Sequence, residues 1–403
     1  MTRIIVFLVL ATAAVAQLPR VATVDPHLLS ELRAANRDTA APSPALQKIR
    51  SDADRALKLA TLSVTMQEIA PPSGDKHDYQ SLAPYFWPNP DTPNHLPYVR
   101  RDGERNPEIY AVPNHGNFDK VMSAAWNLGL AYYLFGDERY AAKSAELLRA
   151  WFLDPATRMN PNLQFAQAVR GVNDGRGTGL IETRAISRLV DGVSLLAGSK
   201  SWTAADQRGL EDWCAKFLAW MQDSKNGQAE ARAKNNHGTY YDVQVISLAL
   251  FTGKVDLAKS IAEQAKQKRI AYQVEPDGRM PLELARTKSF SYSTMNLSGL
   301  FELANLAERA GVDLWTFRTQ DGRSIRAALD YLVPFATGEK KWETKQIEPM
   351  RPQELAPLLL QAAQHFHDPR YREVALKLDP SVKNSLTAAL LDHADSSAAT
   401  AAK

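Results

Sequence analysis

The sequence predicts an all-α protein assembled from helical hairpins, with long loops between them. Apolar residues recur at helical spacing along most of the chain, and no stretch shows sustained period-two alternation. Two helices are expected within residues 26–66, and helical structure interrupted by turns is expected from Phe118 to Phe152. Further helices are expected at Leu180–Leu196, Ala204–Asp223, Tyr241–Thr252, Asp256–Arg269, Thr294–Ala310, Ser324–Phe335 and Gln353–His365.

A helix–turn–helix pattern occurs twice with similar residues. Residues 131–146 and 248–263 each run from a buried helix through a glycine-containing turn into an amphipathic helix, and Leu297–Gly311 is expected to end a third copy. Each copy has the pattern of an αα-hairpin. Repeated hairpins either stack into a solenoid or close into an α/α toroid. The long loops favour a toroid whose loops gather over one mouth and form a cleft for a polymer.

The first residues have the pattern of a signal peptide. An apolar run over residues 4–15 follows Arg3, and a small-x-small pattern over residues 14–16 precedes Gln17. The run is too short to cross a membrane as a mature helix. We therefore expect a periplasmic or secreted protein with no membrane partner, divided into a signal peptide (1–16), one domain (17–395) and a low-complexity Ala- and Ser-rich tail (396–403).

Composition and charge exclude some partners. The 403 residues are 45% hydrophobic and 23% charged, which is ordinary for a globular protein with a large core. The formal net charge of +3 is too small to indicate nucleic-acid binding, although it is compatible with an anionic polymer. Cys214 is the only cysteine, and its apolar helical context predicts a buried, unreactive thiol. The sequence leaves the oligomeric state open.

Two long segments rich in Pro, Asn, Asp and Gly interrupt the helices, at residues 73–117 and 154–179. Loops of this length are usually functional or disordered. The first also carries aromatic residues, which disordered linkers rarely contain: Tyr79, Tyr85, Phe86, Trp87 and Tyr98. We therefore expect an ordered loop that lines or covers a site.

Residues 235–241, Asn-Asn-His-Gly-Thr-Tyr-Tyr, stand where a buried helix begins. Free backbone N–H groups and the positive end of the helix dipole favour an anionic ligand at such a position. The amide, imidazole and phenol groups of this stretch suit holding a carboxylate and moving a proton. From these residues alone, an asparagine N-cap followed by a histidine with a local hydrogen bond is the competing interpretation.

A second polar segment, residues 278–292, precedes the helix expected to start near Thr294. Arg286 is suited to a bidentate pair with a carboxylate, and the phenol of Tyr292 to donating or accepting a proton. The alternative is structural, with Arg286 paired to Glu283 and Tyr292 merely packed.

Other chemistries have weaker support in the sequence. None of the eight histidines stands in an H-E-x-x-H pattern, and His365 and His367 would face different sides of a helix, so no metal site is predicted. No G-x-S-x-G elbow supports a Ser-His-Asp triad. Paired carboxylates for glycoside hydrolysis remain open, because acidic residues lie in the loop regions: Asp78, Asp174, Glu182 and Glu283.

Six motifs in order carry a family resemblance. They are Gly-Asp-Lys-His-Asp-Tyr at 74–79, Ser-Leu-Ala-Pro-Tyr-Phe-Trp-Pro at 81–88, Arg-Arg-Asp-Gly at 100–103, Asn-Pro-Asn-Leu at 160–163, Asn-Asn-His at 235–237 and Leu-Glu-Leu-Ala-Arg at 282–286. Together they resemble the alginate lyase family, which takes in polysaccharide lyase family 5 and the related family 38. The resemblance spans roughly residues 70–300. It implies an incomplete α/α toroid and β-elimination on a polyuronate, with no metal or other cofactor needed.

The resemblance also assigns roles by position. Asn236 and Arg286 would bind and neutralise the carboxylate beside the reacting carbon, which stabilises an enolate-like intermediate. Tyr292 would protonate the departing glycosidic oxygen and, in mannuronate or glucuronate, also remove the α-proton from the same face. His237 would be a base or a second neutraliser, and guluronate, with the two groups on opposite faces, would require it as base. Sugar platforms, a lid or secondary contacts would come from Tyr79, Tyr85, Trp87, Gln167, Arg184 and Tyr241.

The sequence leaves one assignment and two other functions open. Tyr240 and Tyr241 compete with Tyr292 as the catalytic tyrosine. We predict a secreted polysaccharide lyase that cleaves a β-1,4-linked polyuronate, either polymannuronate or glucuronan. The alternatives are a metal-independent glycoside hydrolase using two loop carboxylates, and a non-catalytic glycan-binding protein using Trp87 and the tyrosines.

Overall fold

A computed structural model of the chain describes residues 18–37 and 42–401. The predicted signal peptide, residues 1–16, lies outside the described residues. The α-helices are α1 (Pro26–Arg37), α2 (Pro44–Ala56), α3 (Asn114–Phe135), α4 (Glu138–Leu148), α5 (Ile186–Ser194), α6 (Ala204–Asp223), α7 (Lys225–Ala231), α8 (Asn236–Phe251), α9 (Val255–Ala265), α10 (Pro281–Leu284), α11 (Ser289–Arg309), α12 (Ile325–Ala336), α13 (Ala356–His365), α14 (Pro369–Leu378) and α15 (Leu386–Ala401). Shorter helical turns are η1 (Val64–Met66), η2 (Pro107–Ala111), η3 (Arg149–Leu153), η4 (Gly177–Thr183), η5 (Lys266–Ala271), η6 (Pro352–Leu355) and η7 (Pro380–Asn384).

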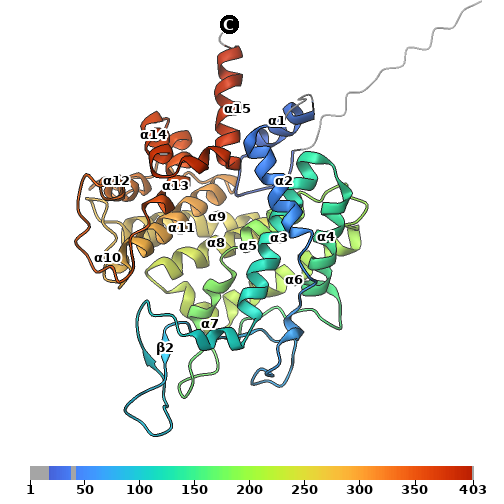
Figure 1. Cartoon of the computed structure of the whole chain (residues 1–403), viewed down its shortest axis with the longest axis vertical. Helices are drawn as coiled ribbons and strands as arrows, with labels where there is room; N and C mark the ends of the chain where they lie inside the picture. The colour runs from blue at the N-terminus through green and yellow to red at the C-terminus, as the bar shows by residue number, and fades with distance from the viewer. Residues whose placement is uncertain (1–17, 38–41, 402–403) are drawn as a thin grey trace, which may run out of the picture.

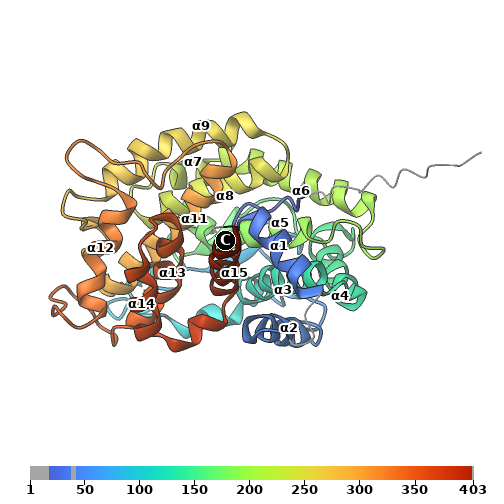
Figure 2. The ribbon, with the colours of Figure 1, turned by 90° about the horizontal axis from the view of Figure 1, so that it is seen from above.

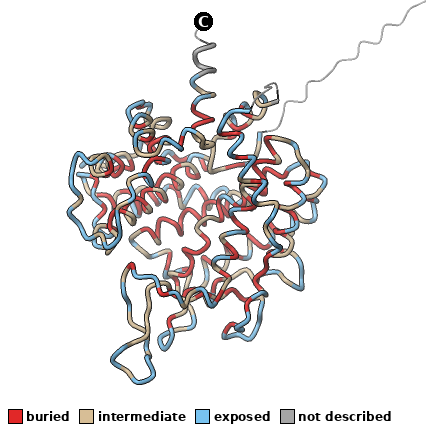
Figure 3. The backbone as a smooth tube through the Cα atoms, in the orientation of Figure 1, coloured by how far each residue is buried: buried red, intermediate tan, exposed pale blue. Residues whose placement is uncertain are grey.

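The helices form an incomplete ring with an inner and an outer layer, seen from above in Figure 2. On the inner side α3 packs against α5, α5 against α8, and α8 against α11. The outer helices α4, α9 and α12 each pack against an inner neighbour. The inner helices are buried along most of their length (Figure 3), and 13 of the 16 residues of α8 are buried. A helix that is covered on all sides shows no single polar stripe, and the polar side chains within α8, such as Asp242 and Gln244, are buried with the apolar ones.

Both repeated hairpins are confirmed. α3 ends at Phe135 and α4 begins at Glu138, across a turn in which Gly136 has a φ of 70°. In the second hairpin, Gly253 has a φ of 74° between α8 and α9. Glycine suits these turns because a side chain is disfavoured in the left-handed region. The third expected turn is also present after α11, but the next helix, α12, follows only at Ile325.

The two ends of the chain pack against each other and against the ring. α15 packs against α13, α2 and α1, and α1 in turn packs against α3. Before α1, the backbone N–H groups of Ala22 and Thr23 donate to the carboxylate of Asp191 on α5, at 2.9 and 2.7 Å. The Thr23 hydroxyl donates to the same carboxylate at 2.6 Å. Burial raises the pKa of Asp191 to about 6 in spite of these donors.

The described residues also contain two short sheets that the sequence pattern did not indicate. β1 (Gln80–Leu82) pairs in parallel with β4 (Phe165–Ala168), and β2 (Phe86–Trp87) pairs antiparallel with β3 (Val99–Arg100). Strands of two to four residues are too short to show an alternating pattern. The β1–β4 pair joins the two long loop segments, which lie at the same end of the ring in Figure 1.

Several helix boundaries differ from the sequence prediction. α8 and α11 each begin five residues earlier than expected, at Asn236 and Ser289, because polar residues in their first turns hide the helical pattern. α7, α14 and α15 were not among the expected helices, and α15 includes residues 396–401 of the predicted low-complexity tail. Alanine favours helix, which explains this extension. Within residues 18–37 and 42–401, no helix is both long and apolar enough to span a membrane.

The anchor at Asp191 predicts a stability effect. Replacing Asp191 with Ala leaves two backbone N–H groups and one hydroxyl without their acceptor, so we expect the free energy of unfolding to fall by about 2–4 kcal/mol. Urea denaturation followed by circular dichroism measures this change. Thr23→Val removes only the hydroxyl and should cost less than ~1 kcal/mol. Equal stability of the Asp191 variant and the wild type would show that these hydrogen bonds do not stabilise the fold.

Candidate active site

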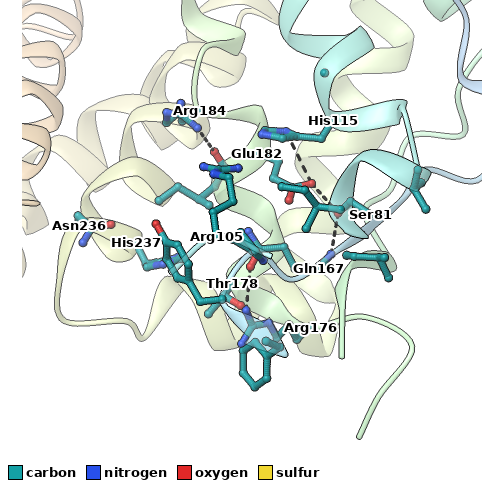
Figure 4. Close-up of a pocket in the computed structure, with 18 of the residues that line it drawn as sticks. Ser81, Arg105, His115, Gln167, Arg176, Thr178, Glu182, Arg184, Asn236 and His237 are labelled. Carbon is teal, nitrogen blue, oxygen red and sulfur yellow. Dashed lines mark hydrogen bonds and ion pairs between the residues drawn. The ribbon is translucent and has the colours of Figure 1, made fainter. Parts of the chain in front are cut away.

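A cavity of about 690 Å³ opens at the mouth that carries the loops. Its wall combines residues 81–86 of the first long loop, the start of α3, η4 of the second loop, and the starts of α8 and α11. Figure 4 shows Asn236 and His237 on one side of this cavity and Ser81, His115 and Glu182 on the other. The two loops and the starts of three inner helices, α3, α8 and α11, therefore supply one site.

The cavity is strongly basic although the whole chain is almost neutral. Six of its lining residues carry a positive charge, and Glu182 is the only acidic residue in the lining. The basic residues are Arg100, Arg105, Lys120, Arg176, Arg184 and Arg286. Such a concentration of one sign favours an anionic ligand.

Asn236 is the first residue of α8 and is 1% exposed. The buried carboxylate of Glu283 accepts hydrogen bonds from its backbone N–H at 2.7 Å and from its side-chain Nδ2 at 2.8 Å. Burial raises the pKa of Glu283, and these two bonds oppose the shift. One Nδ2–H and the Oδ1 atom of Asn236 remain for a ligand. The preceding residue, Asn235, caps the helix through its side chain, as the competing interpretation of this stretch predicted.

His237 is fixed by a second buried carboxylate. Its Nδ1 lies 2.6 Å from Oε1 of Glu230, whose side chain is 2% exposed. Because a carboxylate can only accept here, Nδ1 carries the proton and Nε2 of a neutral ring is an acceptor. His237 lines the cavity. The arrangement is that of a histidine oriented by an acidic partner for proton transfer.

Arg286 and Tyr292 form one unit with the first long loop. The guanidinium donates through Nη2 and Nε to Asp102, at 2.7 and 3.1 Å, and lies 3.6 Å above the centre of the Tyr292 ring. The Tyr292 hydroxyl in turn donates to the Tyr85 hydroxyl at 2.8 Å. Burial and the neighbouring Tyr85 raise the pKa of Tyr292 well above its ordinary value, so the phenol is protonated. The predicted structural pair of Arg286 with Glu283 is replaced by the pair with Asp102.

Three of the predicted substrate contacts, Tyr85, Gln167 and Arg184, also line the cavity. Gln167 has a φ of 52°, which is unusual for a residue with a side chain. Its backbone N–H donates to Ser81 at 2.8 Å, and its Oε1 accepts from Arg176 at 2.9 Å. These contacts hold the strained backbone at the cavity wall.

Three other predicted contacts lie outside the cavity lining. Tyr79 is fully buried and donates its hydroxyl to Glu182 at 2.6 Å, and Tyr241 donates to the Met221 carbonyl at 3.1 Å. Their burial does not fit the predicted sugar contacts, because neither ring can reach a ligand. Trp87 is partly exposed, and its indole N–H donates to the Glu104 carbonyl at 2.9 Å.

The structure separates the three competing tyrosines. Tyr240 donates to the Met295 carbonyl at 3.0 Å and is 6% exposed, and like Tyr241 it does not line the cavity. Tyr292 does. The paired-carboxylate alternative also loses its pair, since Asp78 binds Asn160 and Asn162 within the loops while Glu283 binds Asn236.

Several lining residues were not predicted from the sequence, among them Arg105, His115, Lys120 and Arg176. Asp102 and Glu230 were also not predicted as partners of Arg286 and His237. Each is a single charged residue without a local pattern, and only the Arg-Arg-Asp-Gly motif at 100–103 pointed toward one of them. Within the described part of the chain, no group of three or more His, Cys, Asp or Glu side chains is arranged to hold a metal ion.

Comparison with known proteins places this site in a family. Residues 63–342 match the alginate lyase family. The crystal structure of an alginate lyase from Bacteroides ovatus is 36% identical in sequence, with a TM-score of 0.87 over 92% of this chain and 99% of that chain. This chain belongs to the alginate lyase family. It is a polysaccharide lyase, as the motifs predicted.

More distant structures share the fold. Alginate lyase A1-III from Sphingomonas species A1 is 16% identical, with a TM-score of 0.54 over 85% of this chain and 89% of that chain. A His-to-Ala variant of A1-III complexed with a tetrasaccharide is 15% identical, with a TM-score of 0.56 over 89% of this chain and 91% of that chain. The incomplete α/α toroid is thereby confirmed as the fold. The comparison with curated proteins gives no match.

The contact between Asp102 and Arg286 predicts a catalytic effect from a loop residue. In the Asp102→Asn variant the guanidinium loses its bidentate partner and is no longer held against Tyr292, so kcat/KM should fall by about 10–100-fold. The rate of formation of the unsaturated product, followed by ultraviolet absorbance, measures this. Thr287→Val is the matched control, since it removes another contact to Asp102 but keeps the ion pair. An equal loss in both variants would argue against a specific role of the ion pair.

Proposed function

We propose that this lyase cleaves a β-1,4-linked polyuronate of the alginate type by β-elimination, in the periplasm or outside the cell. The observation that carries the proposal is the basic cavity in which Asn236, His237, Arg286 and Tyr292 meet. A polyuronate has one carboxylate per sugar, so several subsites would each need a cation. The export part of the proposal rests on the apolar run and cleavage pattern over residues 4–16.

Unpaired polar atoms in the cavity wall support a ligand there. Arg176 Nε and Thr178 Oγ1 are buried and have no hydrogen-bond partner among the described residues, and both residues line the cavity. Buried polar groups without partners cost stability and are rare in folded proteins. A bound sugar or its carboxylate would satisfy both atoms.

The proposed reaction begins with neutralisation of the carboxylate at C5 of the sugar. The free Nδ2–H of Asn236 and the outer edge of the Arg286 guanidinium donate to this carboxylate. Negative charge that develops on it as the C5 proton leaves is then stabilised, as in an oxyanion hole. Glu283 and Asp102 hold these two donors in place, so little reorganisation is needed when the charge develops.

Proton transfer is assigned to His237 and Tyr292. A base removes the C5 proton, the C4–O bond breaks, a C4–C5 double bond forms, and an acid protonates the departing glycosidic oxygen. Nε2 of His237 is the acceptor left by the Glu230 contact, and protonated Tyr292 is the acid. This division suits guluronate, where the two groups lie on opposite faces. In mannuronate or glucuronate, where the two groups lie on the same face, Tyr292 serves both steps if it first loses its own proton to solvent. The phenolate then takes the C5 proton and returns it to the departing oxygen, while the Tyr85 hydroxyl, 2.8 Å away, can donate a hydrogen bond to the phenolate.

The substrate prediction is tested by a panel of polymers. Polymannuronate, polyguluronate, glucuronan and hyaluronan are each incubated with the enzyme and a chelator, and ultraviolet absorbance from the conjugated double bond is followed. We expect a rise with polymannuronate or glucuronan. New reducing ends without absorbance would indicate hydrolysis and would contradict the proposed elimination.

Two variants distinguish the proposed acid from the proposed base. Tyr292→Phe should lower kcat by ~10²–10⁴-fold on every cleaved polymer, because the departing oxygen loses its proton donor. His237→Ala should lose a similar factor on guluronate linkages and less on mannuronate linkages. Tyr241→Phe is the control, since its hydroxyl contacts only the Met221 carbonyl outside the cavity. Full activity of His237→Ala on all substrates would show that His237 is not the base.

A further inference from the structure

Glu182 is the one acidic residue in the wall of a cavity that otherwise attracts anions. A carboxylate at this position repels the carboxylates of a polyuronate, so its presence needs a reason. It lies in η4 and is 4% exposed. In Figure 4 it stands with His115 and Ser81, on the side of the cavity opposite Asn236 and His237. The position is separate from the residues assigned to the chemistry.

Among the described residues, only one of the two Glu182 oxygens accepts hydrogen bonds. Oε2 accepts hydrogen bonds from the Tyr79 hydroxyl at 2.6 Å and the Ser81 hydroxyl at 2.7 Å. No group among the described residues donates to Oε1. Oε1 is not among the polar atoms that are both fully buried and without a partner. It is therefore accessible, from the cavity that Glu182 lines. The side chain is therefore held rigidly, with one acceptor open to a ligand.

No basic side chain among the described residues donates a hydrogen bond to Glu182. The nearest is His115, whose Nδ1 lies 3.9 Å from Oε2, within ion-pair range but too far for a hydrogen bond. Arg184 donates to the Ile181 carbonyl, and Arg176, whose charge attracts Glu182, donates to Gln167. These cations therefore leave Oε1 without a donor.

We propose that Glu182 is a substrate-binding residue whose Oε1 accepts hydrogen bonds from ring hydroxyls of a uronate residue, and that this subsite therefore requires free hydroxyls. The inference rests on the proposed polyuronate substrate and deepens it. Hydroxyls are the donors that a uronate ring offers, whereas its carboxylate and ether oxygens only accept. An O-acyl group has no hydrogen to donate and adds bulk beside a charged acceptor. Sites built to bind a substrate hydroxyl strongly reject analogues that lack it.

The test compares unmodified polymannuronate with the same polymer after chemical O-acetylation, and with the acetylated sample after mild alkaline de-esterification. If polymannuronate is not cleaved, the cleaved polymer from the panel is used. We expect kcat/KM of the wild type to be at least ~100-fold lower on the acetylated polymer and to recover after de-esterification. Absorbance of the unsaturated product is the readout.

Two variants show whether Glu182 causes the discrimination. Glu182→Gln keeps an oxygen for Tyr79 and Ser81 but presents a neutral amide to the cavity. The ratio of kcat/KM on the unmodified polymer to kcat/KM on the acetylated polymer should therefore fall at least tenfold. Asp119→Asn is the matched control, because it removes a carboxylate on the other side of His115, outside the cavity lining, and should leave the ratio unchanged. Glu182→Asp, which withdraws the oxygen by one methylene, replaces Glu182→Gln should the latter fail to fold by circular dichroism.

The outcomes separate this inference from the proposed function. Equal cleavage of both polymers by the wild type, or an unchanged ratio in the Glu182 variant, would overturn the hydroxyl subsite while leaving the lyase assignment in place. Absence of cleavage of every unmodified polyuronate would overturn the proposed substrate and this subsite together.

Discussion

The ion pair between Asp102 and Arg286 decides the form of the cavity. It joins residues 184 positions apart, one in the first long loop and one just before α11. Although burial raises the pKa of Asp102, hydrogen bonds from Arg286 and Thr287 hold it well below its usual range, so the pair stays charged. The same guanidinium lies on the Tyr292 ring, and Tyr292 contacts Tyr85 in the loop. One contact therefore places the loop, the Arg286 guanidinium and the Tyr292 phenol together.

Buried carboxylates organise the other side of the site. Glu283 holds Asn236, and Glu230 holds His237, each through hydrogen bonds of 2.6–2.8 Å. Both acids lie behind the residues that they orient and do not line the cavity. The cavity thus presents cations and neutral donors to an anionic polymer, while the acids that give these groups their direction are shielded. Glu182, which does line the cavity, is the exception, and it is the residue that we propose binds ring hydroxyls of the substrate.

The toroid supplies the rigid frame for this arrangement. α8 and α11 are inner helices in mutual contact, and their first residues reach the same mouth. The β1–β4 pair brings both long loops to that mouth as well. Because the inner helices are buried on nearly all sides, their ends are held more firmly than loop residues would be, which suits groups that must meet a reacting carbon accurately.

The sequence by itself determined the all-α class and the two repeated hairpins, and it predicts Asn236, His237, Arg286 and Tyr292 as the site residues. Helical periodicity and glycine turns act over a few residues, and the six motifs are contiguous, so both can be read locally. The tertiary structure alone decided which partners orient these groups. Glu230 has no local pattern, Asp102 is marked only by the motif at 100–103, and Glu182 only as one of several loop acids. Tyr79 and Tyr241 have the same sequence character as Tyr85, although burial removes them from the cavity. Burial and ion pairing depend on segments up to 184 residues apart, and such contacts exist only in the folded chain.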